Sequence, residues 1–98
     1  MLEETLIYEV NDLSSAREFL KNHTDKVILT NKEGSTRYYG MLALDYIFKN
    51  LLAEFPQITK IIVNVCDDNA ALFTAIKLNY KNIKYSGKSE AAIKMISE

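Results

Sequence analysis

The feature that most constrains the fold is a pair of short apolar segments on either side of a long amphipathic stretch. The segments read KVILT (Lys26–Thr30) and TKIIVNV (Thr59–Val65), and the second is rich in β-branched residues. Continuous apolar runs of this length are typical of parallel strands buried on both faces. Between them, apolar residues recur at intervals of three and four, the pattern of one helical face. These residues are Leu44, Ile47, Phe48, Leu51, Leu52 and Phe55.

The rest of the chain continues this alternation. TLIYEV (Thr5–Val10) is predicted to be a first strand, and a helix follows it. Asp67 and Asp68 open another helix by capping its free amides, and Asn79 tolerates the left-handed conformation at its end. A short strand in KNIKYSG and a C-terminal helix in SEAAIKMISE give the order β-α-β-α-β-α-β-α. We therefore predict a single α/β domain over residues 1–98, with a mostly parallel four-stranded sheet flanked by helices.

Composition removes several classes of function. Twelve basic and thirteen acidic residues leave a net charge of -1, so no strong field favours nucleic acid or an anionic membrane. The apolar runs are far shorter than the roughly 18 residues that a membrane helix needs. The acidic N-terminal segment does not resemble a signal peptide, and a single cysteine fits a reducing compartment. We expect a cytoplasmic protein without a metal site.

The segment RYYGMLAL carries the strongest functional signal. Arg37 and Gly40 precede the long helix, where free amides and a positive dipole end attract anions. A structural alternative is that Gly40 only eases the chain into the helix and Arg37 is solvated. Tyr38 and Tyr39 are expected to line either an interface or a ligand pocket, because tyrosine suits both roles.

Two motifs in this order resemble the GNAT acetyltransferase superfamily. Arg37 and Gly40 match its [Q/R]-x-x-G-x-[G/A] loop, with Leu42 at the position of the last Gly or Ala. In its N-x-x-A-x-x-L-Y-x-K-L-G-F helix, Asp68 (or Asn69, one residue out of register) takes the Asn position. The matching residues are Ala71, Lys77 and Leu78, while Asn79 and Tyr80 replace Gly-Phe. The resemblance covers Val27 to Tyr85.

The resemblance implies acetyl-CoA as the cofactor, bound through the loop. Its pyrophosphate would lie against the backbone of Thr36 to Leu42, which gives the candidate cofactor residues Arg37, Tyr38, Tyr39, Gly40 and Leu42. The family tyrosine that protonates the leaving thiolate falls on Ala75, which has no proton to give. Weak catalytic candidates are Glu33 as a base and Tyr80 as an acid.

Two functions follow from these observations. The first is a non-catalytic, acetyltransferase-like module that binds another protein or a second copy of itself, for example through an uncovered sheet edge. The second is a minimal acetyl-CoA-binding N-acyltransferase. We favour the first, because the sequence shows no cluster of general acid, base and nucleophile. We therefore expect no cofactor, and acetyl-CoA belongs to the second function.

Overall fold

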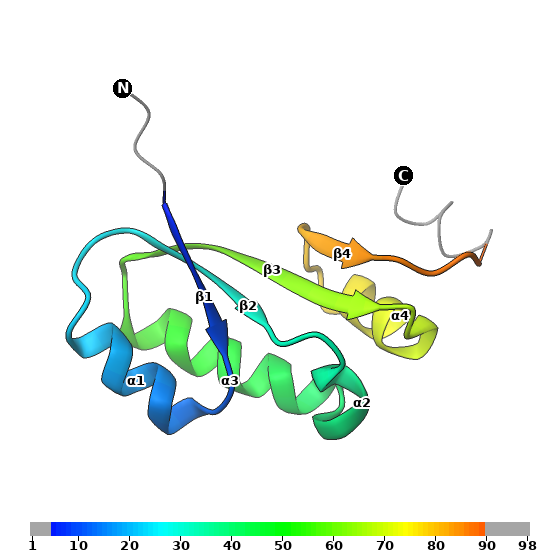
Figure 1. Ribbon diagram of the computed structural model, residues 1–98, viewed down its shortest axis with the longest axis horizontal. Helices are drawn as coiled ribbons and strands as arrows, with labels where there is room; N and C mark the ends of the chain where they lie inside the picture. Colours follow the sequence, from blue (N-terminus) through cyan, green and yellow to red (C-terminus); the bar gives the residue numbers. More distant parts are fainter. Residues whose placement is uncertain (1–4, 90–98) are drawn as a thin grey trace.

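A computed structural model of the chain describes residues 5–89, which form one α/β domain (Figure 1). The elements are β1 (Leu6–Val10), α1 (Leu13–Lys21), β2 (Val27–Asn31), α2 (Ser35–Tyr39), α3 (Met41–Glu54), β3 (Ile58–Cys66), α4 (Asn69–Lys77) and β4 (Ile83–Tyr85). The predicted alternation of strands and helices is confirmed up to the fourth strand. The C-terminal helix predicted in SEAAIKMISE lies outside the described residues.

The four strands form one parallel sheet in the order β1-β2-β3-β4. Each new strand is therefore added on the same side of the previous one. Because the crossover connections of parallel strands are right-handed, every connecting helix then lies on the same face of the sheet. In agreement, α3 contacts both α1 and α4, and Figure 1 shows α1 and α3 running together along the sheet. The domain thus has two layers, one of strands and one of helices.

Burial along the strands alternates, as a sheet covered on one face requires. In β2, Val27, Leu29 and Asn31 are buried, whereas Ile28 and Thr30 are only partly buried. The prediction that the two apolar strands are buried on both faces is therefore wrong. The run looked continuous because the uncovered face of the sheet also carries isoleucines.

The hydrophobic core lies between the two layers. Helix α3 contributes its buried stripe, with Leu44, Phe48 and Leu51 at 1% exposure or less. From α1 the core receives Ala16 and Leu20, and from α4 it receives Leu72 and Ala75. These side chains pack on the helix-facing residues of β2 and β3, so the predicted amphipathic helix is confirmed.

The termini of α4 follow the predicted capping pattern. The Asp68 carboxylate accepts a hydrogen bond from the Ala71 backbone N–H at 3.1 Å, as an N-cap does. At the other end, Asn79 has φ 68°. Its N–H donates to the Ile76 carbonyl, and the Tyr80 N–H donates to the Ala75 carbonyl. This pair of bonds is a Schellman motif, which ends the helix and turns the chain toward β4.

The segment Ser35–Tyr39, which the sequence predicts as loop and helix entry, forms the short helix α2. Gly34 before it and Gly40 after it both have positive φ, at 85° and 82°. Gly40 thus separates α2 from α3 and lets the chain change direction. The two turns place α2 beyond the end of β2, where it borders the candidate site described below.

Candidate functional site

A buried asparagine organises the carboxyl end of the sheet. The side chain of Asn31, at the last position of β2, is 1% exposed. Its Oδ1 accepts from the Asn64 backbone N–H at 2.7 Å, and its Nδ2 donates to the Asn64 carbonyl at 2.8 Å. Pairing between β2 and β3 ends at Thr30 and Ile62. The amide of Asn31 therefore replaces the backbone ladder where the two strands separate.

The same side chain also holds helix α2. Asn31 Nδ2 donates to the Ser35 Oγ at 2.8 Å, and Ser35 is itself 5% exposed. From the next residue of α2, the Thr36 hydroxyl donates to Asp68 at 3.0 Å. Helix α2 is thus hydrogen-bonded both to the end of β2 and to the N-cap residue of α4. These bonds fix the position of α2 above the ends of the strands.

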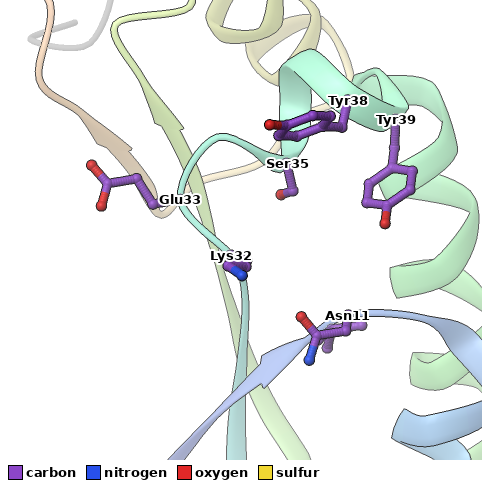
Figure 2. A pocket seen from close by; sticks show the side chains of 7 residues that line it. Asn11, Lys32, Glu33, Ser35, Tyr38 and Tyr39 are labelled. Atoms are coloured by element: carbon purple, nitrogen blue, oxygen red, sulfur yellow. The ribbon is translucent and has the colours of Figure 1, made fainter.

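A pocket of about 310 Å³ lies at this end of the sheet (Figure 2). Parallel sheets commonly bind ligands at the carboxyl ends of their strands, and the volume is at the small end of ligand sites. Residues at the end of β1, after β2 and on one side of α2 line it: Val10, Asn11, Lys32, Glu33, Ser35, Tyr38 and Tyr39.

The pocket brings together three of the residues predicted as site residues, Glu33, Tyr38 and Tyr39. It does not include Arg37, Gly40, Leu42 or Tyr80. Asn31 and Ser35 were missed, because a buried amide is recognised only once its partner 33 residues away is known. The signal available in the sequence was an asparagine directly after an apolar strand.

The loop predicted to hold a pyrophosphate uses several of its amides internally. The N–H groups of Ser35, Arg37 and Gly40 donate to the carbonyls of Lys32, Gly34 and Thr36. The guanidinium of Arg37 lies 2.9 Å from the Asp67 carboxylate, with both side chains exposed. A phosphate at this loop would have to compete with these partners for its donors.

Leu42 and Tyr80 lie outside the pocket. The Leu42 side chain, on the first turn of α3, is 67% exposed. The Tyr80 hydroxyl donates to Asp45 Oδ1 at 2.6 Å, and its ring packs edge-on against Phe48. Burial raises the pKa of Tyr80 above its ordinary value, and the bond to Asp45 adds to this effect. Tyr80 and Glu33 line separate pockets, so the two weak catalytic candidates do not form a common site.

The second surface of note is the uncovered face of the sheet. The register places two rows of side chains across it, Ile7–Ile28–Lys60 and Glu9–Thr30–Ile62, and adds the pair Asn64–Lys84. Ile7 is 55% exposed. Within residues 5–89, no helix covers this face, on which Ile7 is exposed and Ile28 and Ile62 are partly buried.

Clustered metal ligands and membrane-spanning helices are both missing from the described residues. Within 5–89 there is no group of three or more His, Cys, Asp or Glu side chains that could hold a metal ion. No helix in the same range is both long and apolar enough to cross a membrane.

Comparison with known proteins places the chain in a family. It is 50% identical over 93 residues to the uncharacterized protein RP547 of Rickettsia prowazekii (strain Madrid E). The aligned region covers 94% of this chain and 88% of that protein. The chain therefore belongs to the same family as the Rickettsia protein. No protein-family model and no solved structure matches the chain.

The role of Asn31 predicts a large effect of its removal. Asn31→Ala leaves the Asn64 N–H and C=O without partners at the point where the strands separate. We expect it to lower the free energy of unfolding by about 3 kcal/mol, measured by urea unfolding. Asn50→Ala is the matched control, since among residues 5–89 the Asn50 amide bonds only the Tyr46 carbonyl, on an exposed helix surface. Equal losses in both variants would contradict this role.

The buried hydroxyl of Tyr80 gives a second prediction, with a characteristic pH dependence. Tyr80→Phe removes the bond to Asp45 and is expected to cost about 1 kcal/mol at neutral pH. Folding raises the pKa of Tyr80 above 10.0, so its stabilisation is complete below pH 10 and is lost as the pH rises further. The difference between wild type and Tyr80→Phe should therefore shrink above pH 10 in urea titrations. Tyr38→Phe, at an 86% exposed position, should change neither the free energy of unfolding at neutral pH nor its dependence on pH above 10.

Proposed function

We propose that the chain is a non-catalytic α/β interaction module that acts as a homodimer, with the open sheet faces of two copies packed together. The observation that supports this most is the group of apolar side chains on the uncovered face, Ile7 and Ile28 in one row and Ile62 in the next. Full burial of an exposed isoleucine contributes about 1.5–3 kcal/mol, and covering Ile28 and Ile62, which are already partly buried, adds a part of that value. Two copies would supply six such side chains to one interface.

The charges on this face favour a second copy as the partner. Glu9 lies on β1 at one side of the sheet, and Lys60 and Lys84 lie on β3 and β4 at the other. All three charged side chains are exposed, as is Ile7 on the same strand as Glu9. A surface with an acid at one side and bases at the other is complementary to itself after a half-turn.

The register gives the geometry of this pairing. A twofold axis parallel to the strands, lying between the two sheets, brings β1 of one copy over β4 of the other. Glu9 belongs to the row of Thr30 and Ile62, while Lys60 and Lys84 belong to the rows before and after it. Glu9 of each copy would then lie between the two lysines of its partner. Aligned sheets packed in this way are a common arrangement in β-sandwiches.

This proposal shifts the predicted contact from the sheet edge to the sheet face. Pairing through the edge of β1 would leave Ile28 and Ile62 in water, since both lie on inner strands. Face-to-face packing covers them. The small area of a four-stranded face places the interface at the low end of stable interfaces, so we expect a dissociation constant on the order of micromolar.

Charge reversal tests both the dimer and its geometry. Glu9→Lys and Lys84→Glu should each weaken dimerisation about tenfold, measured by sedimentation velocity over a range of concentrations. The double variant Glu9→Lys/Lys84→Glu should recover most of the loss, because it restores the opposite charges with the signs exchanged. Glu18→Lys is the control, since it changes the net charge equally on the exposed surface of α1.

Three outcomes would overturn the proposal. A wild-type chain that stays monomeric at millimolar concentration excludes the dimer. If neither Glu9→Lys nor Lys84→Glu changes the dimerisation affinity, the contact lies elsewhere, for example at the edge of β1. The double variant provides the third outcome. If its loss of dimerisation free energy equals the sum of the losses in the two single variants, the twofold pairing described here is excluded.

A further inference from the structure

The pocket at the end of β1 and β2 is a site that the proposed homodimer does not use. Its apolar wall consists of Val10 and the rings of Tyr38 and Tyr39. Figure 2 shows the Tyr39 ring extending from α2 toward Asn11, with Ser35 and Lys32 bordering the same open space. The carboxylate of Glu33 points to the other side of the loop in this view. The polar groups of Lys32, Ser35 and Asn11 that line the space can all donate hydrogen bonds, and the Asn11 amide also carries an acceptor oxygen.

Ser35 is the most informative of these donors. Its Oγ accepts from Asn31 Nδ2 at 2.8 Å, and the residue is 5% exposed. Within residues 5–89, its own hydroxyl proton meets no acceptor. Buried hydroxyl groups normally have their hydrogen bonds satisfied. A ligand oxygen in the pocket would supply the missing acceptor, and Asn31 would hold the hydroxyl in place.

Lys32 adds a charge next to this hydroxyl. Its side chain is exposed, lines the pocket, and forms no ion pair within the described part of the chain. An ammonium group and a hydroxyl that both donate into one small space suit an oxyanion. The two tyrosine rings and Val10 suit an apolar or aromatic group attached to it.

From this arrangement we infer that the pocket binds a small organic anion, with its carboxylate or phosphate held by the Ser35 hydroxyl and the Lys32 ammonium and its apolar part against Tyr39 and Val10. The volume of about 310 Å³ limits the ligand to a single ring or a short chain. This site is distinct from the Thr36–Leu42 backbone predicted to bind the pyrophosphate of acetyl-CoA, because only the side chains of the pocket are needed.

The test uses benzoate and phenyl phosphate as probes, with neutral benzamide for comparison. The full chain, labelled with ¹⁵N, is titrated with each probe, and amide shifts are followed by NMR. We expect both anions to shift Asn11, Lys32, Ser35 and Tyr39 with a dissociation constant on the order of millimolar, and to bind at least about fivefold more tightly than benzamide. The tighter of the two anions identifies the oxyanion.

Two substitutions in the pocket show whether its side chains hold the anion. Lys32→Met should weaken anion binding about fivefold, while Lys77→Met, exposed on α4, should leave it unchanged. Because Lys32 is exposed, its replacement does not threaten the fold. Ser35→Ala should weaken binding as well, and its thermal unfolding is compared with that of wild type to identify any loss of structure.

The proposal of the anion site and the proposal of the homodimer can be contradicted independently of each other. Glu9→Lys is expected to bind benzoate as wild type does, because Glu9 lies on the open sheet face and not in the pocket. Equal binding of benzamide and benzoate, shifts outside the pocket, or no shift at all would each overturn the inference. Binding of acetyl-CoA alone, with shifts centred on Gly40 and Leu42, would also overturn it and would support the acyltransferase alternative.

Discussion

The side-chain amide of Asn31 is the interaction on which the arrangement of this domain depends most. Parallel strands leave their carboxyl ends unpaired where the chain departs into helices, and buried backbone groups there need partners. Asn31 provides two of them for Asn64 and a third bond to Ser35. A single buried amide therefore satisfies the backbone groups at the end of the sheet and also positions α2. An apolar side chain at this position would fill the space but satisfy none of these groups.

The position of α2 in turn determines the pocket beside it. Held by bonds to Asn31 and Asp68, the helix supplies Ser35, Tyr38 and Tyr39 to the lining of the pocket. The exchange of backbone pairing for side-chain pairing at the end of β2 therefore positions the helix that borders the pocket. The residues that stabilise this end of the sheet also shape the pocket.

The sequence was sufficient for the elements with strong periodicity. The long stripe from Leu44 to Phe55 predicted α3, and the β-branched run predicted β3. Helix α2 was missed because five residues between two glycines are too short to show a helical period. The single helix layer was missed because Ile28 and Ile62 make the strands look buried on both faces. The pocket could be predicted only in part, since Asn31 depends on a contact 33 positions away, and the role of Ser35 follows from its bond to Asn31.

Strand β1 illustrates how so small a domain can carry two separate surfaces. Three successive residues have three different environments: Glu9 on the open face of the sheet, Val10 in the core, and Asn11 at the pocket. Because neighbouring side chains of a strand point to opposite faces, a change at Glu9 alters the open face without entering the core. A change at Asn11 lies beyond the last paired residue and leaves the sheet register intact. The geometry of one strand thus allows the proposed interface and the proposed ligand site to be varied independently, whereas a change at Asn31 disturbs the sheet and the pocket together.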